Sequence, residues 1–330
     1  PSTPALAHAV ARAGGLGFLA AGYLTPERLG EDVASTRAEL DRFGVNVFVP
    51  GRGTSDPRLV DAYAQRLQAE AHRIGIELGQ PRADDDGFEA KIDLLEADPV
   101  AVVSFTFGLP PGDAIPRLHA VGSEVWLTVT SADEARAAAA GGADALIVQG
   151  FEAGGHRGVF ADDETQSDLT LLAALELVGA ASSLPMIGAG AIMTGAAVAA
   201  VLVAGAQAAQ VGTAFLLTPE AGTSEAQRRA TMDPTPTALT RAFSGRSARG
   251  VSNRFLRTYG PLAPSAYPEV NQLTAPLRAH GREHGDPDLI NLWAGQAHVL
   301  AQARGAEELT RQLAREAGQA IARWAGRLPS

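Results

Sequence analysis

The 330-residue sequence contains no cysteine, which excludes disulfides, thiolate metal ligands and a cysteine nucleophile. Basic residues are in the minority: 27 Lys and Arg against 37 Asp and Glu give a net charge of −10. This charge argues against nucleic acid or an anionic membrane surface as a partner. No apolar run approaches the ~20 residues of a membrane-spanning helix, and the first residues lack the pattern of a signal peptide. We therefore expect a protein of the cytoplasm with neither a nucleic-acid nor a membrane partner.

Hydrophobic residues make up 46% of the chain, enough for a sizeable core. Short apolar runs recur along it, and each is followed by a segment with helical periodicity. Because these runs are continuous rather than alternating, they are typical of parallel strands buried on both faces. The seven runs are 16–20, 45–49, 100–105, 125–129, 145–148, 185–188 and 208–212. Repeated strand–helix units fit either an open doubly wound sheet or a closed (β/α)₈ barrel.

The chain begins with a helix rather than a strand. Thr3 and Pro4 form a helix start before residues 5–13, and further starts lie at Thr25, Ser131 and Thr194. A (β/α)₈ barrel needs eight strands, and its first strand precedes its first helix. We therefore expect a (β/α)₈ TIM barrel whose first strand is absent from this sequence, and an open seven-stranded sheet is the alternative.

The pattern changes after about residue 220. Residues 225–230 indicate a short helix, residues 237–267 show no clean period, and 287–299 and 307–327 indicate two amphipathic helices. In the last of these, an apolar residue recurs every four positions, at Leu309, Leu313, Ala317 and Ile321. We expect one domain overall, with a main barrel in 1–220 and the segment 221–330 packed on it as helices. The tail helices could instead form a subunit contact, so a homodimer is a further expectation.

The loop 149–158 carries four glycines and one histidine directly after the apolar run 145–148. Glycine lets backbone N–H groups approach a ligand closely, and His156 can gain or lose a proton near neutral pH. A glycine-rich turn with a surface histidine is the alternative. The chain has no HExxH, Walker A or clustered ligand spacing, so we expect no metal site. The remaining histidines are expected at the surface: His8, His72, His119, His280, His284 and His298.

Small residues end two consecutive predicted strands, at 188–191 and 210–213. Backbone N–H groups and the start of the helix at Thr194 would converge there on an anion. In (β/α)₈ barrels a phosphate commonly binds at the loops after strands seven and eight, which these two runs would be. The sequence therefore favours a phosphate cradle here, although tight helix–strand packing would also select Gly and Ala.

Several segments together resemble the nitronate monooxygenase family, formerly 2-nitropropane dioxygenases, in its class I form. The matching segments are 2–6, 13–17, 44–46, 105–108, 149–158, 188–213, 242–246 and 291–295. The resemblance covers nearly the whole chain and implies an FMN-dependent (β/α)₈ barrel. It implies that nitronates or nitroalkanes are oxidised with O₂ to a carbonyl compound and nitrite.

By this resemblance His156 is the catalytic base, and the remaining matched positions contact the cofactor. Those near the flavin ring or its chain are Asn46, Thr128, Gln149 and Gly154, and those of the phosphate cradle are Gly190, Ala191, Gln210, Val211, Gly212 and Thr213. Ala191 stands where many members have glycine. Thr128 stands where some relatives have lysine or glutamine, which bears on reduction potential and substrate class.

Three other functions remain open at this point. One is a reductase of enoyl-acyl-carrier-protein substrates that uses FMN and NAD(P)H on the same barrel. Another is a flavoenzyme that acts on a nitrogen-containing biosynthetic metabolite. The third is a barrel that binds a phosphate group without flavin. Arg157 is a further candidate for contact with an anion, although an exposed arginine is the simpler expectation.

Overall fold

A seven-stranded parallel sheet forms the centre of the computed structural model, which describes residues 2–51, 56–82, 84–163 and 167–327. The strands follow one another in the order β1–β2–β3–β4–β5–β7–β8. They are β1 (Phe18–Ala20), β2 (Gly44–Phe48), β3 (Val102–Thr106), β4 (Glu124–Val129), β5 (Ala145–Gln149), β7 (Met186–Ala189) and β8 (Ala208–Gln210). Each strand coincides with a predicted apolar run. The sheet is curled as in a TIM barrel, so the predicted fold class is confirmed, although β1 and β8 are not paired with each other in the described chain.

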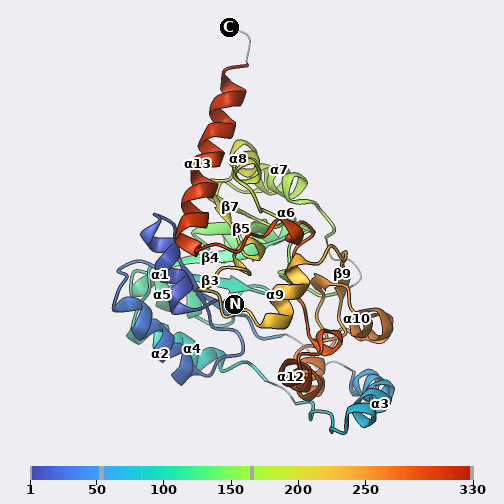
Figure 1. Ribbon diagram of the computed structural model, residues 1–330. Helices are drawn as coiled ribbons and strands as arrows, with labels where there is room; N and C mark the ends of the chain where they lie inside the picture. The colour runs from blue at the N-terminus through green and yellow to red at the C-terminus, as the bar shows by residue number, and fades with distance from the viewer. Residues whose placement is uncertain (1, 52–55, 83, 164–166, 328–330) are drawn as a thin grey trace.

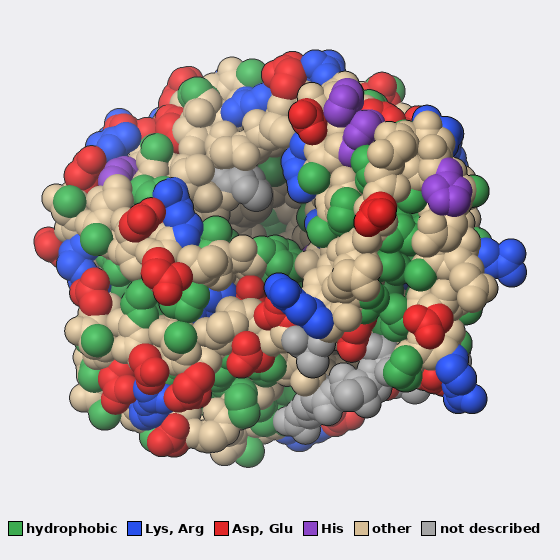
Figure 2. All heavy atoms as spheres, turned by 90° about the horizontal axis from the view of Figure 1, so that it is seen from below, with side chains coloured by type: hydrophobic (Ala, Val, Ile, Leu, Met, Phe, Trp, Pro, Cys, Tyr) green, Lys and Arg blue, Asp and Glu red, His purple; other side chains and the backbone are tan. Residues whose placement is uncertain are grey.

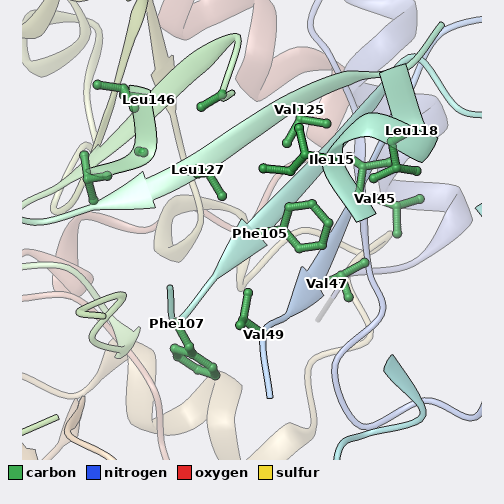
Figure 3. Packing of buried hydrophobic residues seen from close by; sticks show 14 of the residues in the cluster. Val45, Val47, Val49, Phe105, Phe107, Ile115, Leu118, Val125, Leu127 and Leu146 are labelled. Carbon is green, nitrogen blue, oxygen red and sulfur yellow. The ribbon is translucent and has the colours of Figure 1, made fainter. Parts of the chain in front are cut away.

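Helices cover the outer face of this sheet (Figure 1). They are α1 (Pro4–Arg12), α2 (Pro26–Arg37), α4 (Phe88–Ala97), α5 (Ala114–Ala120), α6 (Ala132–Ala140), α7 (Leu171–Ala181) and α8 (Gly195–Val203). The predicted helix starts are confirmed, because the hydroxyls of Thr3, Thr25, Ser131 and Thr194 each accept a hydrogen bond from the backbone three residues later. The core lies between sheet and helices. Figure 3 shows it around Val45, Val47, Phe105, Ile115, Leu118, Val125 and Leu127.

A second, smaller sheet lies beside the barrel, in the order β6–β10–β9. It joins β6 (Gly155–His156) to β9 (Thr237–Thr240) and β10 (Ala248–Val251), and all pairings are antiparallel. Four helices lie around it. They are α9 (Glu225–Met232), which precedes β9 in the chain, and α10 (Arg254–Tyr259), α11 (Glu269–Leu273) and α12 (Ala275–His284), which follow β10. His156 of the loop 149–158 is thus paired with Ala248 of a strand almost a hundred residues further along the chain.

Helix α3 (Pro57–Ile74) leaves the barrel and joins this C-terminal part (Figure 1). Its Tyr63 hydroxyl donates to the Ala242 carbonyl at 2.8 Å. Glu70 of α3 is buried and pairs with Arg254 of α10 at 2.7 Å and with Arg73 at 2.5 Å. A hydrophobic cluster of Val60, Tyr63, Leu67, Phe243, Phe255, Tyr259, Val270, Leu273, Leu277 and Leu289 fills the space between them. The predicted division into 1–220 and 221–330 remains a prediction, and α3 packs across it.

The last helix, α13 (Ala306–Ala325), packs on α8 and α1 and extends beyond the body of the molecule (Figure 1). Leu309, Leu313 and Ala317 of the predicted stripe are buried, whereas Ile321 is 36% exposed. No helix in the described ranges is both long and apolar enough to cross a membrane.

The helix predicted over 287–299 is wrong. That segment holds only two short turns, Pro287–Leu289 and His298–Leu300. Between them the chain pairs with β10: the Val251 N–H donates to the Leu292 carbonyl at 2.8 Å, and the Ala294 N–H donates to the Arg249 carbonyl at 3.3 Å. Pairing with the small sheet therefore overrides the local helical periodicity.

Candidate active site

A cavity of about 970 Å³ opens between the β1 and β8 edges of the sheet and the helices α1, α8 and α13. Its lining includes Gly154 and Gly155 of the histidine loop, the segment 210–213 and Trp293. This volume falls at the upper end of the roughly 300–1,000 Å³ typical of ligand and cofactor sites. The space-filling view also shows a hollow in the face seen from below (Figure 2). The cavity brings Gly154 and Gly155 of the histidine loop and the 210–213 half of the predicted phosphate cradle to one site, whereas His156, Asn46, Thr128, Gln149, Gly190 and Ala191 are not among the described residues that line it.

Three hydroxyls and an amide form a chain at the ends of β2, β3 and β4. The Asn46 Oδ1 accepts hydrogen bonds from Ser104 Oγ and Thr106 Oγ1, each at 2.9 Å. Thr106 Oγ1 lies 3.3 Å from Thr128 Oγ1. A Cβ added to Gly158 would lie 2.5 Å from Thr128 Cγ2, so Thr128, the last of these hydrogen-bonded side chains, packs against the histidine loop. Thr106 thereby links Asn46 and Thr128, two residues that are predicted to contact the flavin.

Gln149 at the end of β5 holds the histidine loop in position. Its Nε2 donates to the His156 carbonyl at 3.0 Å, and its Oε1 accepts from the Gly158 N–H at 2.9 Å and from Arg157 Nη1 at 3.1 Å. The amide orientation follows from these partners, because the carbonyl oxygen faces two donors. Gln149 therefore fixes the backbone on both sides of Arg157.

The His156 imidazole lies among aromatic rings. Its centroid is 5.5 Å from that of Trp293, 5.8 Å from Phe107, 6.2 Å from Tyr267 and 6.4 Å from Phe48. Phe107 lies just beyond the end of β3 (Figure 3). We call Phe48, Phe107, Tyr267 and Trp293 the aromatic cage.

Ser244 fixes the protonation pattern of the imidazole. Its Oγ lies 2.9 Å from His156 Nε2 and donates to the Arg246 carbonyl at 3.1 Å. A hydroxyl that donates to a carbonyl accepts from its other neighbour, so the hydrogen-bond network assigns the proton of neutral His156 to Nε2. In the described chain Nδ1 has no hydrogen-bond partner, and its lone pair is available to accept a proton.

Burial among these rings and the nearby cations Arg246 and Arg278 lower the pKa of His156 to about 3. Both causes disfavour the imidazolium form. The Arg246 guanidinium stacks on Phe107 with Cζ 3.9 Å from the ring centroid and donates to the Val159 carbonyl. Within the described ranges neither arginine has a carboxylate within 4.0 Å, and burial lowers the pKa of both. The site is therefore positively charged around a neutral histidine.

Two glycines, one in the predicted cradle and one in the histidine loop, open onto free space. A Cβ added to Gly212 or to Gly155 would meet nothing within 4 Å, whereas one on Gly190 would lie 3.3 Å from Ala153 Cβ. Gly190 has φ of 132°, and Ala191 has φ of 49°, a left-handed conformation that is unfavourable for alanine. The Thr213 Oγ1 accepts from the Gly295 N–H at 3.1 Å, which ties the cradle to the segment beside Trp293.

The start of α8 already has an anionic partner within the protein. The Gly195 N–H donates to Glu316 Oε2 of α13 at 3.3 Å, and the Ala197 N–H donates to Thr194 Oγ1 at 3.2 Å. The N–H groups at this helix start were predicted to bind a ligand anion, and one of them instead binds the carboxylate of Glu316. Within the described ranges, the backbone N–H groups of 190–191 and 212–213 donate to no protein acceptor.

Arg157 lies inside the protein, so its expected exposure is wrong. It has no exposed surface, and it donates from Nη1 to the Gly150 carbonyl at 2.7 Å and from Nη2 to the Ser167 carbonyl at 2.9 Å. The surface prediction is also wrong for two histidines. His8 is 7% exposed beside Thr36, and His298 is 2% exposed between the Thr231 and Thr235 carbonyls. In each case backbone carbonyls replace water as the partner.

Several residues of the site were not assigned a role from the sequence. They are Ser104, Thr106, Phe107, Ser244, Arg246, Tyr267 and Trp293. Five of them lie in segments that matched the family pattern, which was the signal available for them: Thr106, Phe107, Ser244, Arg246 and Trp293.

Comparison with known proteins agrees with this geometry. The family model described as nitronate monooxygenase matches residues 1–316. A nitronate monooxygenase from Pseudomonas aeruginosa is 40% identical over 96% of this chain and 93% of its own length. The chain belongs to the nitronate monooxygenase family. A probable nitronate monooxygenase from Staphylococcus aureus is 35% identical, with 96% and 92% of the two chains covered.

Solved structures place the chain in the same group. Nitroalkane oxidase from Streptomyces ansochromogenes superposes with a TM-score of 0.95 at 46% identity, covering 98% of this chain and 94% of that one. The chain is accordingly an oxidoreductase of the nitronate monooxygenase family. FabK from Thermotoga maritima has a TM-score of 0.74 at 22% identity and shares the fold.

Proposed function

We propose that this enzyme uses FMN and O₂ to oxidise nitroalkanes and nitronates to a carbonyl compound and nitrite. The observation that carries the proposal is His156. It is a histidine with its proton held on Nε2 by Ser244, neutral because of burial and two arginines, in a loop whose Gly154 and Gly155 line a cavity of cofactor size. The free Nδ1 lone pair of this neutral ring can accept a proton from carbon next to a nitro group. The lowered pKa keeps the ring neutral but makes it a weaker base, so the reaction depends on stabilisation of the nitronate charge by the arginines.

The residues present fit FMN. Gly155 and Gly212 leave space where a side chain would project. A Cβ on Gly190 would lie 3.3 Å from Ala153 Cβ, so this contact and its φ of 132° both favour glycine there. We infer that the N–H groups of 190–191 and 212–213 hold the phosphate, and that Asn46, Thr128 and Gln149 contact the flavin ring. When bound, FMN supplies the electron-transfer chemistry that a nitronate and O₂ require.

His156 would act on the neutral nitroalkane through Nδ1. As the carbon loses its proton to Nδ1, Nε2–H continues to donate to Ser244 Oγ at 2.9 Å. The nitro group then carries the negative charge of the nitronate. Arg246 is buried and Arg278 is half-buried, neither has an ion-paired carboxylate among the described residues, and they would stabilise that charge. A substrate that is already a nitronate needs no removal of a proton from carbon, and only the stabilisation of its charge by the two arginines applies.

The test is His156→Asn, measured with two substrates. We expect turnover of neutral nitroethane to fall by about 10²–10⁴-fold, the usual contribution of general base catalysis. Turnover of ethyl nitronate should fall far less, since no proton is removed from carbon. The variant must retain its cofactor, which the absorption spectrum reports. Undiminished turnover of the neutral substrate would exclude His156 as the base.

A further inference from the structure

Tyr23 lies one layer outside the aromatic cage. Its ring centroid is 5.6 Å from that of Phe48 and 6.5 Å from that of Tyr267. The residue is 49% exposed, so one side of the ring faces solvent. Tyr23 therefore lies between solvent and two rings that contact His156.

A small cavity of about 60 Å³ adjoins these rings on the outer side. It is lined by Tyr23, Phe48, Tyr267 and the segments 84–86 and 271–272. This space is large enough to hold water. Phe48 and Tyr267 belong both to this cavity and to the aromatic cage, so the three rings separate it from His156. We call this cavity the outer port.

The backbone of Tyr23 is strained. Its φ of 65° is a left-handed conformation that costs a residue with a side chain roughly 1–2 kcal/mol. The Tyr23 N–H donates to both carboxylate oxygens of Asp86, at 3.0 and 3.2 Å. Strain of this kind persists where surrounding contacts hold it, and it is concentrated at functional sites.

A buried lysine holds these contacts from behind. The Lys91 side chain is 1% exposed, and its Nζ lies 2.7 Å from Asp86 Oδ2. The same Nζ donates to the Ala21 carbonyl at 3.0 Å. Lys91 thus fixes the chain two residues before Tyr23 and also the carboxylate that binds its N–H. A buried ion pair is sensitive to the loss of either partner.

We propose that Tyr23, positioned by the Lys91–Asp86 ion pair, closes the outer port and limits the length of substrate that reaches His156. The inference rests on the proposed function, because it concerns which nitroalkanes the site accepts. On this proposal a short nitroalkane reaches His156 with the ring in place, whereas the chain of a longer one would have to occupy the space of Tyr23. Tyr23 is a specificity-determining residue, and Lys91 and Asp86 are positioning residues.

The experiment compares Tyr23→Ala with the parent enzyme on 1-nitroalkanes from two to six carbons. We expect kcat/KM for nitroethane to stay within about twofold and that for 1-nitrohexane to rise about tenfold or more, the scale on which pockets discriminate by chain length. Tyr23→Phe keeps the ring and should keep the parent profile. Trp324→Ala removes another exposed aromatic, on α13, and serves as the matched control.

A second readout does not depend on turnover. Diethyl pyrocarbonate modifies neutral imidazole, and its rate at His156 can be followed by mass spectrometry in the purified enzyme, with exposed His72 as internal reference. We expect faster modification of His156 in Tyr23→Ala and in Lys91→Met, at an unchanged rate for His72.

The outcomes separate the two claims. If Tyr23→Ala leaves both the chain-length profile and the His156 modification rate at the parent values, the proposal that Tyr23 closes the outer port is wrong. If the parent enzyme oxidises no nitroalkane or nitronate, the proposed function is wrong, and the modification rates still decide whether Tyr23 limits access to His156.

Discussion

The lowered pKa of His156 predicts that acidification will leave proton abstraction almost unchanged. An ordinary histidine, with a pKa near 6.5, would be about 97% protonated at about pH 5, and a base of that kind would lose roughly 30-fold in rate from about pH 8. With a pKa of about 3, His156 is almost entirely neutral at both values. We therefore expect kcat/KM for a neutral nitroalkane to change by less than about twofold over this range.

The assay is the initial rate of nitrite release from nitroethane, with oxygen saturating and protein folding checked at each pH. Arg246→Gln removes one of the two cations that lower the pKa, so its profile should begin to fall on the order of one pH unit higher. Arg246→Lys keeps the charge and should keep the parent profile.

The reasoning would be refuted by an apparent pKa between about 6 and 7 for the parent enzyme that disappears in His156→Asn. That result would place His156 in a solvated environment and would remove the physical basis for its neutral form in the cage.

Three further predictions concern stability and the cradle. The pKa of Glu70 is lowered to about 2 by Arg254 and Arg73. Because the folded value lies below the unfolded one, this carboxylate contributes up to about 3 kcal/mol above pH ~4.5, and the contribution is lost as pH falls toward 2. Urea unfolding of Glu70→Gln should show a loss of that size at neutral pH and little loss near pH ~2.5. An equal loss in the free energy of unfolding at both pH values would contradict a stabilising role for the ionised Glu70 carboxylate. Ala191→Gly should stabilise the fold by up to about 1 kcal/mol, because relief of left-handed strain exceeds the entropic cost of glycine; calorimetric destabilisation would show that Ala191 is unstrained. Gly212→Val should fold normally, since its Cβ meets no protein atom within 4 Å, yet lose FMN by absorbance after gel filtration. Full retention of FMN would place the phosphate elsewhere.

The barrel could be predicted from sequence because its signals are local. Each strand is a continuous apolar run, and a helix start such as Thr25 or Ser131 depends on residues only three positions away. The position of His156 at a strand end followed from the same pattern.

The environment of His156 could not be predicted in this way, because it depends on distant pairing. Ser244 lies 88 positions from His156, and the two meet only because β10 pairs with β6. Arg157 looks like a surface residue in sequence, yet the backbone carbonyls of residues 150 and 167 satisfy its guanidinium inside the fold. The segment 287–299 has helical periodicity, but pairing with β10 determines its structure.

The most direct test of the proposed function is the visible absorption spectrum of the purified enzyme, followed without oxygen by propionate 3-nitronate and, separately, by NADPH. We predict flavin bands that are bleached by the nitronate and unaffected by NADPH. Bleaching by NADPH alone would contradict the account in favour of a reductase. A colourless protein that FMN does not reconstitute would contradict it in favour of a barrel that binds phosphate without flavin.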